Sequence, residues 1–406
     1  MVQRTKLGKK ILVIFNAIST EGITSLSGGD RIVVELFKRW QNNFQEIRVI
    51  TCRVGEKLFA QASHALHNFI FSVIHIPKKY YQNLFILYVS RTLKGLMMVS
   101  KLQNEKFDFV YSSSDFWPDV IPAFWLKLIK PKTTWLAGFY MFAPNPIAND
   151  SPYKDENFLK GLLYYLTQLP IYFIVKTFAD YVLVTSEPDV EKFITSKRPK
   201  EKIIVVQGGV EIIESEKYLA DRENIISPEK RKYDACFVGR FHYQKGVEEL
   251  IDIWKRVCNR IPNATLAMIG TGPLEEKVKR KIIELNLNKN INLFGFRDGK
   301  EKYGIFKNSK IILHPATYDS GGMAAAEGMA WGLPGVSFDL PALKSYYPKG
   351  MIKTKRFDLD EFANNIIELL HNQNRYNKIS ENAHDLIKKS WDWNKKSNQI
   401  FNKIFC

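Results

Sequence analysis

The chain has 406 residues, 45% hydrophobic and 25% charged, and its 59 Lys and Arg against 42 Asp and Glu give a net charge of +17. That composition excludes a disordered chain, and the length exceeds one ordinary core, so two domains of about 200 residues each are expected. The positive charge favours anionic partners, but no block of five or more basic residues occurs, which argues against nucleic acid. Four scattered cysteines without a C-x-x-C pair argue against a zinc site or disulfide framework and predict a cytoplasmic protein.

Apolar runs alternate with amphipathic stretches along the whole chain. In the first half, strands are expected at residues 11–15, 47–51, 109–112, 134–137, 181–185 and 203–206, with helices at 31–40, 84–102 and 120–129. After a charged stretch at 214–232 the pattern restarts, with strands at 235–238, 265–269, 291–294, 311–314 and 335–338 and helices at 247–260, 274–285, 300–308 and 358–371. Continuous apolar strands between helices indicate parallel sheets covered on both faces.

The restart of the pattern divides the chain into two doubly wound blocks. We expect an N-terminal domain over residues 1–210, a C-terminal domain over 211–390, and a last helix in 391–406 that packs back toward the first domain. Ligands bind at the carboxyl ends of parallel strands. The predicted ligand site is therefore the cleft between the two domains.

One stretch of the second half combines a loop carboxylate, glycines and a second carboxylate. It reads Asp319-Ser-Gly-Gly-Met-Ala-Ala-Ala-Glu327 and leads from the strand at 311–314 into a helix expected over 324–331. Free N–H groups at a helix start bind phosphate, and a carboxylate one turn inside suits sugar hydroxyls because it accepts two hydrogen bonds. Phosphate and polyol held together describe a nucleotide sugar.

Two loops supply further candidates, each with a plain alternative. Arg240 and Lys245 flank a short loop after the strand at 235–238, where they can clamp a diphosphate or simply be solvated surface charges. Gly28 and Gly29 precede the first helix, where they form an ordinary turn or let the backbone approach a phosphate. The glycines of Gly270-Thr-Gly-Pro273 are explained by the turn alone.

These residues resemble family-4 glycosyltransferases in motif order and spacing. The resemblance covers residues 234–340 and rests on Gly239-Arg240-x4-Lys245-Gly246, Gly270-Thr-Gly-Pro273, His314-Pro315 and Asp319-x7-Glu327-Gly-Met-Ala-Trp-Gly-Leu-Pro334. The resemblance implies a GT-B fold of the α/β class, with two doubly wound Rossmann-like domains facing a central cleft. It also implies a retaining hexosyltransferase that uses a UDP- or GDP-linked sugar and needs neither metal nor cofactor.

The resemblance also implies roles for single residues. Glu327 would bind the donor ribose, Asp319 would contact the transferred sugar, and Arg240 and Lys245 would neutralise the leaving diphosphate. Backbone groups would hold the distal phosphate, cover the phosphates from the opposite domain and grip the nucleobase. The implied donor-binding set is Gly28, Gly29, Arg240, Lys245, Gly295, Phe296, Asp319, Ser320, Gly321, Gly322, Met323, Ala324 and Glu327, with Asp319, Arg240 and Lys245 catalytic.

Three positions depart from the family pattern. Asp319 stands where the family has glutamate, Gly321 stands where an aromatic residue is frequent, and no histidine follows the strand at 109–112. Asp115 is the polar residue near that last position, and it is equally suited to cap the helix that follows. These departures keep two alternatives open, a nucleotide-sugar-binding scaffold subunit without activity and a GT-B epimerase.

The first half also contains stretches suited to a membrane surface. Residues 80–98 are aromatic and basic, and residues 158–178 are mostly apolar but interrupted by Lys160, Gln168 and Lys176. Such interruptions favour a buried or interfacial helix over a transmembrane one. Two interpretations stay open: these helices cover the sheet, or they lie on an anionic inner membrane face as part of a peripheral enzyme with a glycan or lipid-linked acceptor.

Overall fold

The computed structural model describes residues 8–17, 27–62, 67–148, 151–153 and 157–406. The chain folds into two compact units, each with its own parallel sheet. Unit 1 comprises Met1–Gln207 together with Ser397–Cys406, and unit 2 comprises Gly208–Lys396. The two parallel sheets confirm the α/β class expected from the strand pattern.

Unit 1 contains a seven-stranded sheet in the order β3-β2-β1-β4-β5-β6-β7, with every neighbouring pair parallel. Its strands are β1 (Lys10–Phe15), β2 (Glu46–Cys52), β3 (Phe69–Ile74), β4 (Phe109–Ser112), β5 (Thr134–Gly138), β6 (Tyr181–Val184) and β7 (Ile203–Val205). Its helices are α1 (Gly28–Trp40), α2 (Arg53–Ala62), α3 (Leu84–Lys101), α4 (Trp117–Ile129), α5 (Phe158–Phe178) and α6 (Val190–Phe193).

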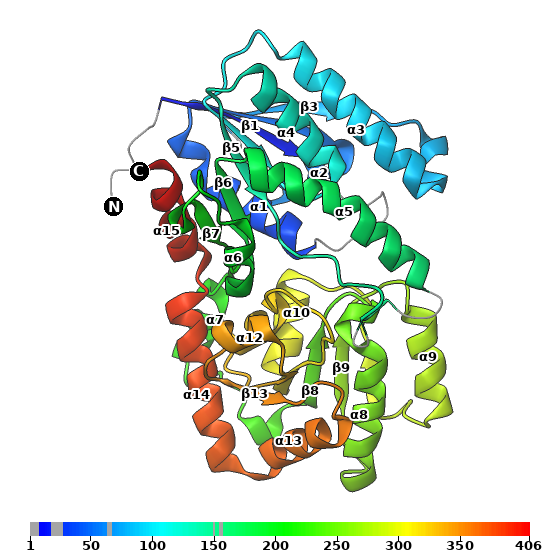
Figure 1. The fold of residues 1–406 in the computed structure, drawn as a ribbon. Coiled ribbons are helices and arrows are strands. Elements are labelled where there is room, and N and C mark those ends of the chain that lie inside the picture. Colours follow the sequence, from blue (N-terminus) through cyan, green and yellow to red (C-terminus); the bar gives the residue numbers. More distant parts are fainter. Residues whose placement is uncertain (1–7, 18–26, 63–66, 149–150, 154–156) are drawn as a thin grey trace. The chain divides into compact units, whose positions relative to one another are not determined.

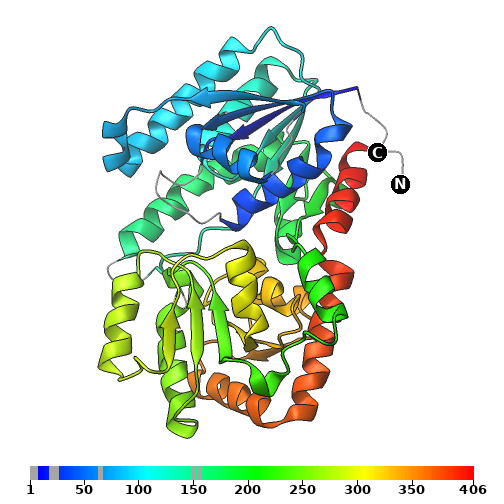
Figure 2. The same cartoon turned by 180° about the vertical axis from the view of Figure 1, so that it is seen from behind.

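The strand order of unit 1 decides which face each helix covers. The chain runs outward from β1 to β3 and then returns to β4, so right-handed crossovers place helices before and after that return on opposite faces. Helices α1 and α2 accordingly lie on one face, and α3, α4 and α5 lie side by side on the other (Figures 1 and 2). Fully buried side chains such as Val120 and Val175 seal α4 and α5 onto the strands.

The last helix, α15 (Trp393–Phe405), packs its C-terminal part on unit 1 beside α1 (Figure 2). The indole N–H of Trp40 donates to the carbonyl of Ser397 over 3.0 Å. Trp40 and Phe44 each meet Phe401 and Phe405 edge-on, with ring centroids 5.2–6.2 Å apart. Aromatic pairs in this range add to the area they bury, so these rings anchor the end of the chain to unit 1.

Unit 2 contains a six-stranded parallel sheet in the order β10-β9-β8-β11-β12-β13. Its strands are β8 (Tyr233–Val238), β9 (Leu266–Ile269), β10 (Ile291–Leu293), β11 (Ser309–His314), β12 (Gly335–Phe338) and β13 (Met351–Thr354). Its helices are α7 (Ile213–Ala220), α8 (Val247–Arg260), α9 (Glu275–Glu284), α10 (Gly299–Lys307), α11 (Met323–Met329), α12 (Pro341–Tyr346), α13 (Leu359–His371) and α14 (Gln373–Ser390).

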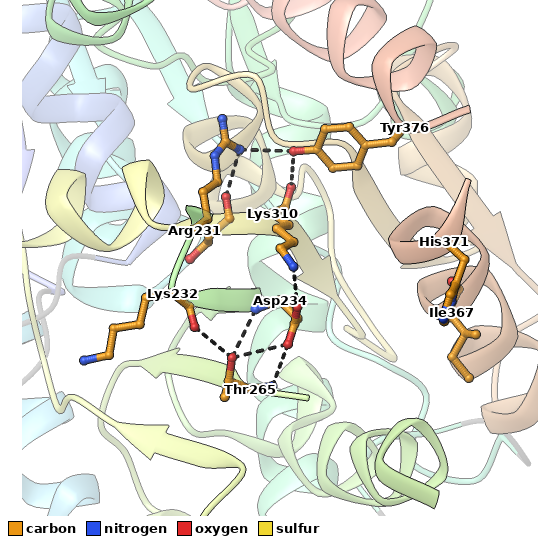
Figure 3. A network of polar contacts seen from close by, with 9 residues as sticks. Arg231, Lys232, Asp234, Thr265, Lys310, Ile367, His371 and Tyr376 are labelled. Atoms are coloured by element: carbon orange, nitrogen blue, oxygen red, sulfur yellow. Dashed lines mark hydrogen bonds and ion pairs between the residues drawn. The ribbon is translucent and has the colours of Figure 1, made fainter. Parts of the chain in front are cut away.

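A polar network fixes the amino ends of three neighbouring strands of unit 2 (Figure 3). The Asp234 carboxylate at the start of β8 accepts from the Lys310 ammonium of β11 over 2.7 Å and from the Thr265 amide before β9 over 2.9 Å. Arg231 donates to the Tyr376 hydroxyl of α14 over 3.1 Å, and that hydroxyl donates to the Lys310 carbonyl over 3.0 Å. These contacts set the strand register at the edge opposite the loops considered below.

We expect Phe401→Ala to destabilise unit 1 by about 3–5 kcal/mol, because it removes a buried ring from the α15 anchor. Equilibrium unfolding in urea measures the change. Phe357→Ala is the matched control, since Phe357 is 48% exposed and belongs to unit 2. Equal losses in the two variants would contradict an anchoring role for α15.

Candidate donor site

An ion pair joins the loops that follow two neighbouring strands of unit 2, β8 and β11. The Lys245 ammonium lies 2.5 Å from Oδ2 of Asp319, and His314 Nε2 lies 3.3 Å from the same oxygen. The other carboxylate oxygen, Oδ1, accepts from the amides of Gly321 and Gly322 over 3.1 Å each. Asp319 therefore shapes the loop that begins α11 and also holds Lys245 there.

A glycine makes this approach of the two loops sterically allowed. Gly246 has φ +62°, and a Cβ at that position would lie 1.9 Å from the carbonyl oxygen of Pro315. The carbonyl of Gln244 accepts from the Thr317 amide over 3.0 Å, which ties the same loop to the chain after β11. Any side chain at residue 246 would push Lys245 away from Asp319, because backbone cannot yield as a flexible side chain can.

The electrostatics of Asp319 follow from its partners. Burial alone would raise its pKa, but the Lys245 charge and His314 outweigh burial and hold the pKa well below the ordinary carboxyl value. Asp319 is thus an anion across the physiological range. Its contact with the transferred sugar, which the resemblance implies, stays a prediction, because the contacts described here are all to protein groups.

Glu327, in α11, belongs to a buried charge cluster that the sequence did not reveal. The Lys302 ammonium of α10 lies 2.9 Å from Glu327 and 2.7 Å from Asp298, which directly precedes that helix. Lys302 is 5% exposed and Glu327 8% exposed. Lys302 thus connects the carboxylate implied to bind ribose with the segment after β10, where Gly295 and Phe296 lie. The one sequence signal for this role is the i,i+4 spacing of Asp298 and Lys302.

The remaining candidates of unit 2 lie around the same strand ends. Arg240 is exposed in the loop after β8, and no described residue forms an ion pair with it. The Gly270-Thr-Gly-Pro273 turn holds that loop, since Phe241 donates its amide to Thr271 over 2.9 Å and its carbonyl accepts from the Leu274 amide over 3.1 Å. This agrees with a structural role for the turn.

The loop between Asp319 and α11 contains Ser320 and leads into a helix that begins one residue earlier than expected, at Met323. Met323 and Ala324 are half-buried in its first turn, where the amides of a helix lack intrahelical partners. The Tyr347 hydroxyl donates to the Gly322 carbonyl over 2.7 Å and supports the loop from behind. Asp319 already uses the Gly322 amide, so Met323 and Ala324 are the better candidates to meet an anion.

Two predicted residues of unit 1, Gly28 and Gly29, form the first turn of α1. Ser27 and Asp30 cap this helix reciprocally, side chain to backbone, over 3.1 and 3.2 Å. A Cβ at Gly29 would lie 2.9 Å from the ring of Tyr140, so glycine allows close packing here. The part of the preceding loop at residues 18–26 lies outside the described residues.

Asp115 does not cap the following helix, so that interpretation is wrong. The N-cap of α4 is Phe116, whose side chain makes no capping bond. Asp115 instead accepts from the Gln168 side-chain amide of α5 over 2.7 Å. Burial raises the pKa of Asp115 to about 6 despite that hydrogen bond, which acts to lower it. Helix α4 lacks a side-chain N-cap because the Asp115 carboxylate bonds to α5 instead.

A second buried carboxylate, Asp119, was missed by the sequence analysis. Its Oδ1 accepts from the amides of Asn16 and Ala17 after β1, over 2.7 and 3.0 Å. Its Oδ2 accepts from the hydroxyls of Ser113 and Ser114 after β4, over 2.7 and 2.5 Å. Burial raises the pKa of Asp119 to about 6 against these four lowering contacts. Asp119 therefore joins the carboxyl ends of two neighbouring strands.

No group of three or more His, Cys, Asp or Glu side chains suited to a metal ion occurs within residues 8–17, 27–62, 67–148, 151–153 and 157–406. At the strand ends of unit 2, Lys245 and Lys302 are each paired with a carboxylate, whereas Arg240 forms no ion pair with a described residue. Such pairs suit a ligand that itself has both phosphate and hydroxyl groups.

The chain is similar in sequence to several known proteins. Residues 220–386 match the family described as glycosyl transferases group 1. A protein of Methanocaldococcus jannaschii named an uncharacterized glycosyltransferase is 31% identical over 62% of this chain, which spans 64% of that relative. An uncharacterized Klebsiella pneumoniae protein in a cps region is 24% identical over 68% of this chain and 72% of its own length.

A structural comparison covers both units. The Anabaena protein HepE, solved in complex with UDP-glucose, superposes with a TM-score of 0.69 at 15% sequence identity. The superposition covers 98% of this chain and 99% of HepE. At that identity the likeness establishes the fold.

We expect Lys302→Met to destabilise unit 2 by about 3–5 kcal/mol, because Glu327 would stay buried without its cation. Adding Glu327→Gln should recover most of the loss. Urea unfolding at neutral pH measures both variants. Lys279→Met, which removes an exposed pair with Glu276, should leave the stability of unit 2 nearly unchanged. Lys302→Met behaving like that control would refute the buried pair.

The buried carboxylates of unit 1 predict a pH dependence with a definite sign. Their folded pKa of about 6 exceeds the unfolded value of about 3.9, so the folded state binds protons more tightly and stability falls as pH rises between these values. Lowering pH from 7 to 5 should therefore stabilise unit 1 by about 1 kcal/mol for each of Asp115 and Asp119.

Asp119→Asn should remove about half of that gain, because the amide keeps an acceptor for Asn16 and Ala17 but does not titrate. Urea unfolding of wild type and variant at both pH values measures the difference. A pH response unchanged by Asp119→Asn would show that Asp119 titrates in its ordinary range.

Proposed function

We propose that this chain, whose residues 220–386 belong to the glycosyl transferases group 1 family, is a glycosyltransferase. It moves a hexose from a nucleoside-diphosphate sugar to an acceptor hydroxyl with retention of anomeric configuration and without a metal ion. One observation carries the proposal: two cation–carboxylate pairs, Lys245–Asp319 and Lys302–Glu327, lie at the carboxyl ends of the strands of unit 2. That edge is where open α/β sheets bind ligands.

Glu327 and the segment around Gly295 are proposed to bind the nucleoside. Lys302 donates to Glu327 and fixes its position, and a carboxylate is a strong acceptor for ribose hydroxyls. The UDP-glucose in the HepE structure supports a nucleotide-sugar donor for this fold. The UDP- or GDP-linked donor remains the proposed class.

Arg240 and Lys245 are proposed to stabilise the leaving diphosphate. As the bond from the anomeric carbon to the diphosphate oxygen breaks, negative charge grows on that oxygen. The acceptor oxygen bonds to the same face of the anomeric carbon, and its proton passes to the departing diphosphate. Cations that are already positioned beside this oxygen stabilise its negative charge without reorganising. They therefore lower the barrier more than solvent can. Lys245 would exchange part of its contact with Asp319 for the diphosphate.

The acceptor is proposed to be a glycan or a lipid-linked glycan bound by unit 1, in the assembly of a surface polysaccharide. The similarity to a protein in a cps region supports this pathway class. The buried cluster of Asp115, Asp119 and Gln168 at the carboxyl edge of unit 1 provides a rigid base for such a site. A scaffold subunit or an epimerase of the same fold is the alternative.

We expect Arg240→Ala and Lys245→Ala each to lower kcat by about 10²–10³-fold, the loss seen when one charge-stabilising group is removed. A panel of UDP-, GDP- and ADP-sugars with a glycan acceptor supplies the assay, and NMR of the product gives its anomeric configuration. Lys289→Ala, at an exposed site between α9 and β10, is the control.

Three results would contradict the proposed function. Wild-type turnover by both variants would exclude the two cations from the reaction. An inverted product would exclude same-face transfer. An absence of turnover with every donor, together with intact nucleotide binding, would favour the scaffold alternative.

A further inference from the structure

The three helices on one face of unit 1 expose an unusual amount of apolar surface. On α3, Phe85 is 70% and Met97 61% exposed, and on α4, Trp125 is 41% exposed. On α5, Leu163, Leu166 and Phe173 are 62%, 54% and 58% exposed. Because α4 packs against both α3 and α5, these exposed side chains lie on neighbouring helices on one face of the sheet, which we call the α3–α5 surface. Apolar surface of this extent marks a binding face.

Helix α5 is apolar on two opposite sides. Leu159, Leu163, Leu166 and Phe173 recur at helical spacing on its exposed side. The opposite side packs on the sheet, and its Ile171 is fully buried. One side of this helix therefore belongs to the core of unit 1, and the other side has no counterpart among the described residues of the unit.

Helix α5 is also the one described helix long and apolar enough to cross a membrane by length and composition. Its buried side argues against crossing. Gln168 donates to Asp115 and to the Met141 carbonyl over 2.7 and 2.8 Å and accepts from the Ala143 amide over 2.8 Å. A spanning orientation would break these bonds and strip Ile171 from the core. The helix is suited to lie against a membrane with its fold intact.

The charges of the α3–α5 surface are of one sign. Helices α3, α4 and α5 contain six basic residues, of which Arg91 is 4% exposed, and a single acidic one, Asp119, which is 1% exposed. Lys101 ends α3 and Lys160 begins α5, and both are exposed. An apolar surface with basic residues at its margins matches an anionic bilayer, whose headgroups attract the lysines while the apolar side chains enter the interface.

We propose that the α3–α5 surface docks on an anionic lipid bilayer, with the exposed side of α5 lying in the interface. A second copy of the chain is the other occupant to consider. A symmetric dimer sets the same patch of both subunits face to face, so the basic margins would meet each other. Like charges with no exposed acidic residue on the same helices disfavour that pairing, whereas anionic lipid neutralises them.

Sedimentation with sucrose-loaded vesicles tests the proposal. We expect the full chain to bind vesicles of mixed phosphatidylglycerol and phosphatidylcholine at low salt, and to bind phosphatidylcholine alone at least about tenfold more weakly. Leu163→Asp with Phe173→Asp should lower the partition coefficient by at least about tenfold. Lys101→Glu with Lys160→Glu should weaken binding to the anionic vesicles and reduce its dependence on salt.

Two matched controls lie on elements that do not belong to this surface. Ile283→Asp changes a 61% exposed apolar residue on α9, and Lys403→Glu changes an exposed lysine on α15, which packs beside α1. Both should bind like wild type, and thermal unfolding followed by circular dichroism confirms that every variant folds.

Three outcomes would overturn the proposal. The first is no binding of wild type to anionic vesicles. The second is equal binding by the Leu163→Asp, Phe173→Asp variant and the Ile283→Asp control. The third is a dimer, seen by sedimentation velocity, that the Leu163→Asp, Phe173→Asp variant dissociates, because the surface would then join two copies. None of these results depends on sugar transfer, so the docking surface and the proposed function can fail separately.

Discussion

The contact between Lys245 and Asp319 is the constraint on which the candidate donor site depends. It crosses from the loop after β8 to the loop after β11, two neighbouring strands, and Gly246 is what lets the loops meet. The other carboxylate oxygen of Asp319 accepts a hydrogen bond from the backbone just before α11. One carboxylate therefore fixes both the Lys245 ammonium and the loop. The second pair, Lys302 with Glu327, links α10 to α11 in the same way. The candidate site thus contains two cation–carboxylate pairs, whose members stabilise each other.

Most of the fold could be predicted from the sequence, because buried parallel strands are continuous apolar runs. Two strands were not predicted from the sequence, β3 (Phe69–Ile74) and β13 (Met351–Thr354). Both lie at the edge of a sheet with partly exposed side chains, and Ser72 and Lys353 interrupt their apolar runs. Helix α14 (Gln373–Ser390) also escaped, since few of its residues are buried and its polar side chains hide the helical period.

The candidate site was predictable where its residues stand in recognisable motifs at the ends of strands. Asp319 and Glu327 belong to one motif, so the sequence alone could place both carboxylates beside the start of a helix. The role of Lys302 could not be predicted, because lysines are usually exposed and its partner Glu327 lies on another helix. Asp119 resembles an ordinary first-turn acid of α4. Only the fold brings it to the amides of Asn16 and Ala17, about a hundred residues earlier.

Nucleotide-dependent thermal stability tests the central claim most directly, namely that unit 2 binds a nucleoside diphosphate through Glu327 and its neighbours. UDP, GDP and ADP, each compared with its monophosphate, are added to wild type, to Glu327→Ala and to Glu276→Ala, which alters an exposed carboxylate on α9. At about 100 times Kd a ligand adds about 2.7 kcal/mol of stability. We expect one diphosphate to raise the Tm of wild type and of Glu276→Ala and to leave the Tm of Glu327→Ala unchanged. No rise with any diphosphate, or an equal rise in all three proteins, would contradict it.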